Sequence, residues 1–206
     1  MNLKEDYHVH CNYNDHSEPD LTIRNVVKRA EDIGLCTLAF TEHVRSTSSW
    51  IQDYLNEIDL FNKNLKIRII AGFEAKILKD GSIDCSKKYS NKYLVIASFH
   101  NSFNDKKIWM NALQKAIENP DVDIIGHLAP EPAFKVERNE IELLASIIAD
   151  KKKIVEINAK YHRPPADWIH VFKSRGVKFQ LGSDAHALRD VGQFDRISDL
   201  ISLVDK

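Results

Sequence analysis

Seven short β-rich runs recur along the chain at a spacing that leaves room for a helix after most of them. They span residues 6–10, 35–40, 67–73, 93–99, 122–125, 154–157 and 177–181. Several are continuously apolar, which is typical of strands covered on both faces, as in a parallel sheet or barrel. The pattern therefore predicts a parallel α/β fold.

Helical patterns lie between these runs, at residues 22–33, 50–63, 107–119, 137–150 and 167–175. Gly34 and Gly176 directly follow two of them and are typical helix stops. The tryptophans of these patterns, Trp50, Trp109 and Trp168, are assigned to packing of helices on the sheet. Seven strands in 206 residues fit a compact, slightly incomplete (β/α) barrel better than an eight-fold one. No linker interrupts the pattern, so residues 1–206 are expected to form a single domain.

The composition gives no sign of a nucleic-acid or membrane surface. Lys and Arg (29) nearly balance Asp and Glu (30), whereas a protein that holds duplex nucleic acid usually carries an excess of basic residues. The N-terminus lacks the apolar core of a signal peptide, and no apolar run approaches the length of a membrane span. The three cysteines are odd in number and widely spaced, which predicts a cytoplasmic protein with reduced thiols: Cys11, Cys36 and Cys85.

Residue types that bind metals follow every predicted strand. They are His8, His10 and, a little beyond, His16, then Glu42, His43, Glu74, His100, His127, Glu156, Asn158, Asp184 and His186. In a (β/α) barrel the carboxyl ends of the strands converge on one mouth, where the active site is built. Any single histidine could be an ordinary core or surface residue. Seven of the nine histidines lie at strand ends or just beyond, however, and together they predict a metal cluster.

The residue types in this pattern indicate hydrolytic chemistry. His8 and His10 alternate on one strand, so both imidazoles share a face and can reach one ion. Imidazole and carboxylate without thiolate suit Zn²⁺, Mn²⁺ or Fe²⁺, and a carboxylate such as Glu74 can bridge two ions. The seven histidines together with Glu74 and Asp184 make nine candidate ligands, which are too many for one tetrahedral site and suit two or three ions. Metals about 3.5–4 Å apart activate water and clamp a phosphoryl group, so no serine or cysteine nucleophile is required.

The motifs resemble those of the PHP (polymerase and histidinol phosphatase) family, in the family's order and over essentially the whole chain. The matching stretches are DYHVH with His16 six residues beyond His10, AFTEH, AGFEAKI, IASFH, IIGH, EIN and LGSDAH. The segment DGSIDCSKKY, with the later YLVIASFH, looks like the stand-alone bacterial phosphatases of the family. It is also similar to the PHP module of bacterial family X DNA polymerases.

The resemblance implies a distorted (β/α)₇ barrel, TIM-like, with a trinuclear metal site. The first metal would be held by His8, His10, Glu74 and Asp184, the second by Glu74 as bridge with His100 and His127, and the third by His16, His43 and His186. Catalysis is assigned to Glu74, Asp184 and His186. Glu42 stands where the family usually has Asp and is expected to orient His43 or a neighbour. A histidine at position 16, where many relatives have Asp, favours the phosphatase-like branch.

A substrate phosphate needs positive charge beyond the metals. Lys160 and Arg163 follow the strand that ends at Asn158, and both are predicted to face the mouth. Family phosphatases often place a phosphate-binding Arg in this loop, although the spacing here does not align cleanly. Asn158 is expected to hydrogen-bond the substrate. Arg45 is a weaker candidate, with a solvated loop charge as its plainer interpretation.

The leading hypothesis is a phosphomonoesterase that hydrolyses a small phosphorylated metabolite or nucleotide. A metal-bridging hydroxide would attack phosphorus in line, while the third metal would stabilise the departing alkoxide. The alternatives are a nuclease or phosphodiesterase that acts on nucleic-acid ends, and a histidinol-phosphate phosphatase, whose relatives are generally longer. A non-catalytic regulatory module would be expected to have lost ligands, and a C–N amidohydrolase would order them differently. Nothing in the pattern predicts an oligomeric state.

Overall fold

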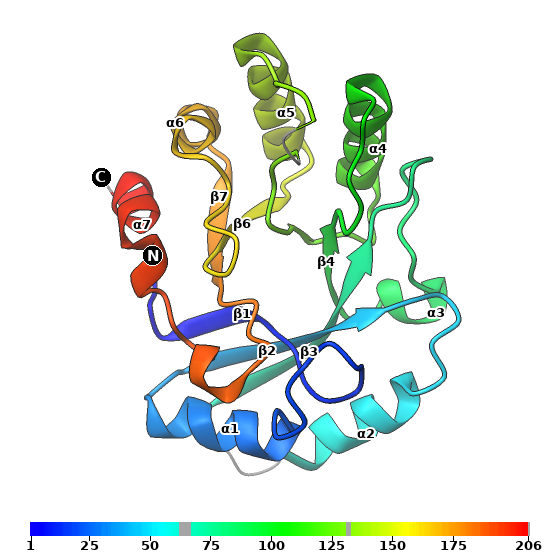
Figure 1. Ribbon diagram of the computed structural model, residues 1–206, viewed down its shortest axis with the longest axis vertical. Helices are drawn as coiled ribbons and strands as arrows, with labels where there is room; N and C mark the ends of the chain where they lie inside the picture. Colours follow the sequence, from blue (N-terminus) through cyan, green and yellow to red (C-terminus); the bar gives the residue numbers. More distant parts are fainter. Residues whose placement is uncertain (62–66, 131–132, 206) are drawn as a thin grey trace.

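The computed structural model describes residues 1–61, 67–130 and 133–205, and its seven parallel strands form a nearly closed barrel with helices around it (Figure 1). The strands are β1 (Glu5–Val9), β2 (Thr37–Val44), β3 (Arg68–Lys76), β4 (Leu94–Ser98), β5 (Ile124–Ile125), β6 (Ile154–Asn158) and β7 (Lys178–Gly182). Each strand pairs in parallel with the next, in sequence order. The predicted distorted (β/α)₇ barrel is therefore confirmed.

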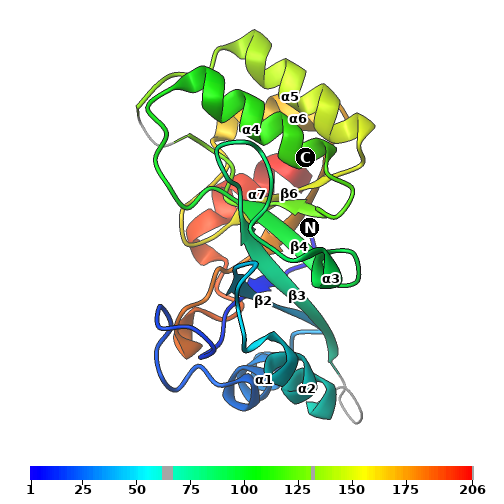
Figure 2. The same ribbon diagram turned by 90° about the vertical axis from the view of Figure 1, so that its right-hand side faces the viewer.

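The five predicted helices are present with small differences at their ends. They are α1 (Ile23–Asp32), α2 (Ile51–Phe61), α4 (Lys106–Glu118), α5 (Arg138–Asp150) and α6 (Ala166–Ser174). The last two residues of the predicted helix 50–63 lie outside the described part of the chain. Thr22, predicted to begin the first helix, caps it instead, because its Oγ1 accepts a hydrogen bond from Asn25 N. Figures 1 and 2 show α1 and α2 on one side of the strands and α4, α5 and α6 on the other.

Four short helical elements were not predicted: α3 (Lys87–Ser90), the 3₁₀ turns η1 (Leu188–Asp190) and η2 (Asp195–Ile197), and α7 (Ser198–Asp205). The longest of them, α7, packs beside α6. Elements this short show too few turns for a clear apolar period. Their docking on the barrel, which the chain pattern does not display, stabilises them.

Strands β2 and β3 are longer than predicted. Their register continues through His43 opposite Glu74 and Val44 opposite Ala75. Both of these candidate ligands therefore lie on strands rather than in the loops that follow. Because strand side chains alternate, every second residue here points to the same side of the sheet.

The seam between β1 and β7 is closed by a buried carboxylate. Asp6 Oδ1 accepts hydrogen bonds from Ser183 N (2.9 Å) and His8 N (3.3 Å), and Oδ2 accepts one from Gly192 N (3.0 Å). Asp184 N also donates to the carbonyl of His8, at 2.7 Å. Burial raises the pKa of Asp6, against these hydrogen bonds. The seam places the end of β7 directly beside the end of β1.

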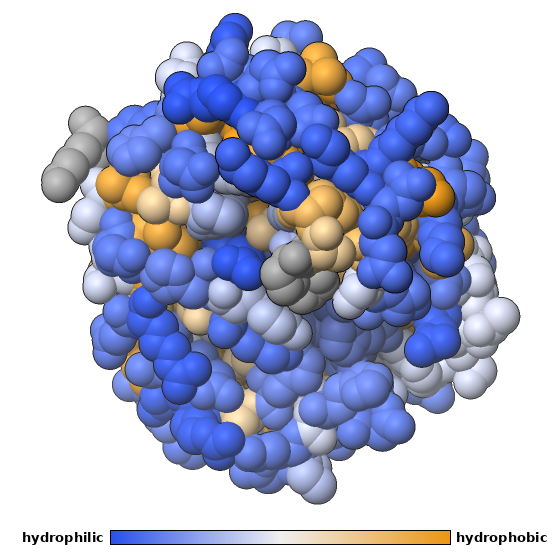
Figure 3. All heavy atoms as spheres, turned by 45° about the horizontal axis from the view of Figure 1, so that its top comes forward, coloured by the Kyte–Doolittle hydropathy of each residue, from blue (hydrophilic) through white to orange (hydrophobic). Residues whose placement is uncertain are grey.

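Most of the large apolar side chains lie in the core between the strands and helices. The large hydrophobic side chains that are exposed come from separate elements: Leu3, Leu60, Ile108, Leu143 and Tyr161. The face in Figure 3 is accordingly mostly hydrophilic, with small apolar patches. All three cysteines are free thiols, and Cys36 is the exposed one. Among the described residues, no helix has both the length and the apolar character that a membrane span requires.

Candidate metal centre

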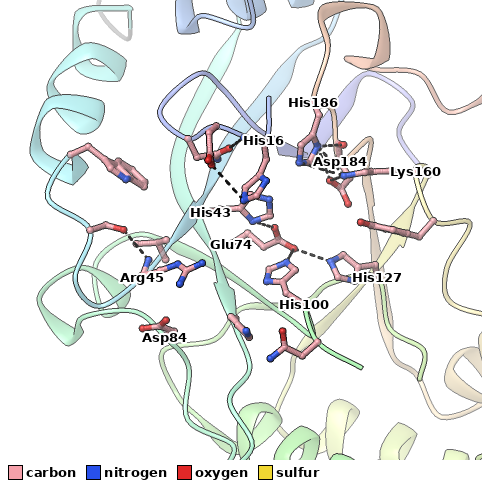
Figure 4. Close-up of a pocket in the computed structure, with 18 residues that line it drawn as sticks. His16, His43, Arg45, Glu74, Asp84, His100, His127, Lys160, Asp184 and His186 are labelled. Atoms are coloured by element: carbon pink, nitrogen blue, oxygen red, sulfur yellow. Dashed lines mark hydrogen bonds and ion pairs between the residues drawn. The ribbon is translucent and has the colours of Figure 1, made fainter. Parts of the chain in front are cut away.

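The carboxylate of Glu74, on β3, faces histidines from the ends of several strands (Figure 4). Its Oε1 lies 3.0 Å from His100 Nε2 and 2.9 Å from His127 Nε2. Its Oε2 lies 2.7 Å from His43 Nδ1. Although His43 is this close, Oε2 is buried and has no hydrogen-bond donor of suitable geometry among the described residues. An ionised oxygen without a donor, set among imidazoles, suits a bound cation.

A second part of the cluster lies where β1 and β7 meet. His8 and His10 are fully buried, and their Nε2 atoms are 3.1 Å apart. These nitrogens lie 3.5 and 3.6 Å from Glu74 Oε2. Asp184 Oδ1 lies 3.4 Å from His10 Nε2 and 3.3 Å from His186 Nδ1. The three residues assigned to catalysis therefore share one cluster.

Three sets of side chains bring their ligand atoms within 4.8 Å of one another: His8, His10 and Asp184; His10, His43 and His186; and His43, Glu74 and His100. The sets share His10 and His43, so they form a continuous cluster. The first set has three of the four ligands assigned to the first metal. His43 was assigned to the third metal, with His16 and His186. In the structure it belongs both to the set with His10 and His186 and to the set with Glu74 and His100.

His16 lies at the rim. Its side chain is 64% exposed, and its ring is 5.7 Å from that of His43, centroid to centroid. It lines the pocket but belongs to none of the three sets. The structure therefore gathers eight of the nine predicted ligands and leaves the ninth at the edge.

Two buried carboxylates orient the paired histidines of β1. Glu156 Oε1 lies 2.6 Å from His8 Nδ1, and its Oε2 accepts a hydrogen bond from His127 N at 2.6 Å. Glu42 Oε1 lies 3.3 Å from His10 Nδ1. A carboxylate on the outer ring nitrogen fixes the tautomer, so that the inner nitrogen is free to bind a metal. Glu42 therefore contacts the ring of His10, and it also accepts a hydrogen bond from the backbone N of His43 at 2.8 Å. It was expected to orient His43 or a neighbour, and the ring that it contacts is that of His10.

Gly182 leaves the space that Glu156 occupies, and Gly126 lies against the same carboxylate; neither glycine was predicted to have a role. A Cβ on Gly182 would overlap Glu156 Oε1 and lie 2.7 Å from the Cβ of His8. A Cβ on Gly126 would overlap Ser98 Oγ and lie 3.3 Å from Glu156 Oε2. Each glycine stands one or two residues before a candidate ligand, in IIGH and LGSDAH, and that position was the available signal.

The backbone is strained at two candidate ligands. His127 has φ 26° and Asp184 has φ 55°, a region that non-glycine residues rarely adopt. Such conformations cost on the order of 1–3 kcal/mol each and cluster at functional sites. Here they turn the chain as it leaves β5 and β7, so that both side chains face the cluster.

The cluster concentrates buried negative charge. Glu42, Glu74, Glu156 and Asp184 are each at most 3% exposed. Burial would raise the pKa of Glu74, but His100 and His8 outweigh it and hold that pKa well below its usual value. Histidines likewise hold the pKa of Asp184 well below its usual value against burial. Ionised carboxylates at this depth require compensating cations.

Two histidines of the cluster have pKa values that are shifted in opposite directions. Burial would lower the pKa of His10, but hydrogen bonds to Asp184 and Glu42 raise it to about 9. Burial lowers the pKa of His43 to about 4, despite the nearby Glu74.

Imidazole and carboxylate donors with no thiolate among them fit Zn²⁺, Mn²⁺ or Fe²⁺. The nearest thiol, Cys11, donates to Glu42 Oε2 at 3.1 Å and completes the support of that carboxylate.

Of the three residues predicted to bind substrate, Lys160 alone lines the pocket. Its Nζ lies 3.2 Å from Asp184 Oδ1 and 3.1 Å from His186 Nδ1. Asn158 is fully buried: its Nδ2 donates to Asp184 Oδ2 and its Oδ1 accepts from Tyr161 N. Arg163 pairs through its backbone with Asn158, and its side chain is not among the pocket-lining groups of the described chain. Asn158 therefore holds Asp184 in place.

The cluster forms the floor of a pocket of about 670 Å³. The upper wall includes Arg45, the weaker candidate for the substrate phosphate, and four residues that were given no role or a different one: Trp50, Lys76, Asp84 and Tyr161. Trp50 is a correction, because it lies just before α2 and lines the pocket as well as packing against Tyr13. Trp109 and Trp168 are buried against the barrel, as predicted.

Comparison with known proteins identifies the family. The PHP domain family matches residues 6–160. A protein of Clostridium acetobutylicum named "probable phosphatase" is 26% identical, over 97% of this chain and 86% of its own. One of Vibrio vulnificus with the same description is 30% identical, over 99% and 86%. The DNA polymerase/3′-5′ exonuclease PolX of Bacillus subtilis is 28% identical over 89% of this chain, which spans 34% of that protein.

Solved structures share the fold. The histidinol phosphate phosphatase of Lactococcus lactis, determined with zinc, L-histidinol and phosphate, superposes with a TM-score of 0.71 at 22% identity, covering 98% of this chain and 93% of its own. A Listeria monocytogenes protein assigned as a histidinol phosphatase has a TM-score of 0.74 at 14% identity, covering 92% and 97%. With its barrel, its strand-end ligands and the match over residues 6–160, the chain belongs to the PHP family.

Proposed function

We propose that this chain is a metal-dependent phosphomonoesterase that hydrolyses a small phosphorylated metabolite or nucleotide. The observation that carries the proposal is the buried Glu74 carboxylate, set among five imidazoles on the floor of the pocket. Membership of the PHP family supports it, as do relatives named as phosphatases and a structural neighbour that holds zinc and phosphate.

Two or three ions would be held by the nine residues predicted from the sequence: His8, His10, His16, His43, Glu74, His100, His127, Asp184 and His186. When bound, Zn²⁺, Mn²⁺ or Fe²⁺ supplies a Lewis acid for the phosphoryl group and lowers the pKa of water. Glu156 and Glu42 lie against the Nδ1 atoms of His8 and His10, which leaves the Nε2 atoms of both histidines available to hold a metal ion.

Lys160 is the residue we assign to the substrate phosphate. Its ammonium lies beside Asp184 and His186 at the edge of the cluster, and its side chain is about one third exposed. From there Nζ can donate to a phosphoryl oxygen and neutralise charge as the ester bond breaks. Arg163 stays a weaker proposal, since its side chain would have to turn toward the pocket.

A phosphodiesterase that acts on nucleic-acid ends is the second candidate, because a second hollow adjoins the first. It has a volume of about 340 Å³ and shares Lys160, Asp184 and His186 with the main pocket. A diester has a substituent on each side of phosphorus, and the second hollow gives room for the other one. The match to PolX also favours this candidate. The near-neutral charge of the chain favours small substrates over duplex nucleic acid.

We place the protein in the cytoplasm and treat residues 1–206 as one domain. The three free thiols suit a reducing compartment. All seven strands belong to one sheet, which supports the single domain.

The test is hydrolysis of p-nitrophenyl phosphate beside bis-p-nitrophenyl phosphate, by protein supplied with Zn²⁺ or Mn²⁺. Glu74→Gln keeps the shape of the side chain and removes its charge, and should lower monoester kcat/KM by at least about a hundredfold. Glu118→Gln, at the exposed end of α4, removes the same charge far from the pocket and serves as the control. Preference for the diester would favour the phosphodiesterase, and turnover that survives Glu74→Gln would refute the assigned site.

A further inference from the structure

Two further charged residues, Arg45 and Lys76, lie at the carboxyl ends of the two strands that carry His43 and Glu74. In the pairing of β2 with β3, His43 lies opposite Glu74, and the ladder continues to Val44 and Ala75. Lys76 ends β3 and lies two residues beyond Glu74. Arg45 follows β2 directly and lies two residues beyond His43. At about 3.3 Å of rise per residue, the backbones of these two residues lie about 6.6 Å farther along the chain direction than those of Glu74 and His43.

Both cations line the pocket. Side chains two residues apart on a strand share a face, so Lys76 points to the same side as Glu74. Arg45 and Lys76 are both among the pocket-lining residues, with Arg45 exposed and Lys76 half-buried. In Figure 4, Arg45 lies on the far side of His43 and Glu74 from Lys160. The pocket thus has cations on two opposite sides.

Neither cation has a carboxylate partner within 4.0 Å among the described residues. The acidic residue of the same wall, Asp84, is held by Ser46, whose N and Oγ donate to it at 2.9 and 2.8 Å. Asp15 lies at the rim beside His16. Arg45 and Lys76 directly follow Val44 and Ala75, the last pair of residues between β2 and β3, so their backbones are neighbours. Two positive side chains on one wall repel each other, and an anion bound by both would relieve this repulsion.

The wall also has a fixed flat surface. The ring of Trp50 packs against Tyr13 and Tyr54, with centroids 5.7 and 5.5 Å apart, and lines the pocket. The pocket volume, about 670 Å³, is far more than one phosphate group needs. The remaining space, between the cluster and the two cations, suits the organic part of a substrate.

We infer that Arg45 and Lys76 form a second anion subsite, which binds a carboxylate or phosphate group on the pocket wall beyond the phosphate at the metal cluster. The inference rests on the proposed function and narrows its substrate class. The substrate is then a phosphomonoester that carries a second acidic group on its leaving side, with the chain between the two groups lying along Trp50.

Binding of phosphonates tests this inference without turnover, because their P–C bond is not hydrolysed. The probes are butylphosphonate, 4-phosphonobutyrate and butane-1,4-bisphosphonate, titrated calorimetrically into the Zn²⁺-loaded protein. The second and third add a carboxylate or a phosphonate to the same tail. At least one of these two should bind about tenfold tighter than butylphosphonate, because it gains a charge-assisted hydrogen bond. The tighter of the two shows whether the second acidic group of the substrate is a carboxylate or a phosphate.

The variants Arg45→Gln and Lys76→Gln should reduce this ratio of dissociation constants to about twofold or less. Lys79→Gln, an exposed cation just beyond β3 that does not line the pocket, removes the same charge and should keep the ratio. Equal binding of all three probes by the unaltered protein would overturn the subsite, and so would a preference that survives the double variant.

Hydrolysis of p-nitrophenyl phosphate, measured in parallel, separates this inference from the proposed function. Turnover without any preference among the phosphonates would overturn the subsite and leave the phosphatase standing. A clear preference among the phosphonates without turnover of any monoester would support the subsite and overturn the phosphatase.

Discussion

At the scale of single residues, the candidate site depends on Glu74 and on the groups that keep its neighbours in place. Seven other predicted ligands share its cluster, because the carboxyl ends of parallel strands meet. The residues that hold these ligands in place were harder to predict. Glu156 reaches His8 because Gly182 leaves room for it, and a glycine in a strand does not reveal which side chain uses its space.

Gly182→Ala tests this support. The added methyl would overlap Glu156 Oε1 and push the carboxylate away from His8. Loss of a carboxylate that orients a metal-bound histidine typically lowers metal affinity by about 10–100-fold. Competition with a chelating dye measures the change. Gly176→Ala is the control: its methyl meets nothing within 4 Å, but its φ of +76° costs folding stability. Equal metal affinity in the two variants would contradict the role of Gly182.

The pKa of His10 predicts how pH acts on metal binding. It is raised from 6.5 to about 9, so His10 is protonated at pH 7 in the metal-free protein. A metal must displace this proton, so affinity should rise with pH up to about 9. The folding stability of the metal-free protein should change in the opposite direction. Because folding raises the pKa of His10, protonated His10 stabilises the folded state; this stabilisation is complete below pH 6.5 and is lost as pH rises through about 9. Calorimetry in buffers of different ionisation enthalpy should detect proton release at pH 7, and its absence would refute the assignment.

At the scale of elements, strand existence was predictable and strand extent was not. The apolar runs placed all seven strands, but β2 and β3 continue to Val44 and Lys76 because they pair with each other. This extension carries Lys76 and Arg45 into the pocket wall. From the sequence, Arg45 was only a weaker candidate for the phosphate, with a loop charge as the plainer interpretation, since no local signal shows which strand lies beside it.

The closure of the barrel can be tested at Asp6. Its two oxygens accept hydrogen bonds from Ser183 and Gly192, which hold the segment that carries Asp184 and His186. Asp6→Asn keeps one acceptor and places an amide donor against the other backbone N–H, which should lower the free energy of unfolding by about 1–3 kcal/mol. Hydrogen exchange should become faster in residues 183–192 than elsewhere. Asp195→Asn, on the exposed turn η2, is the control, and protection that is unchanged in both variants would contradict the role of Asp6.

At the scale of the whole molecule, the fold and the ligand cluster follow from one feature, a metal-binding residue after each strand of a parallel barrel. The residues that line the substrate pocket were harder to predict from the sequence. Arg163 was predicted to face the mouth, but its backbone pairs with Asn158 and its side chain does not line the pocket. Trp50 was assigned to packing and also forms pocket wall. The direction in which a loop leaves its strand decides both cases, and local residue patterns do not encode it.

The most direct test of the central claim is the metal content of protein purified without chelator, measured by mass spectrometry for the unaltered chain and for Glu74→Gln. The cluster of buried carboxylates and imidazoles predicts two or three divalent ions per chain, with at least one lost in the variant, whose bridging charge is gone. Metal-free protein, or a content that Glu74→Gln leaves unchanged, would contradict a metal centre built on Glu74.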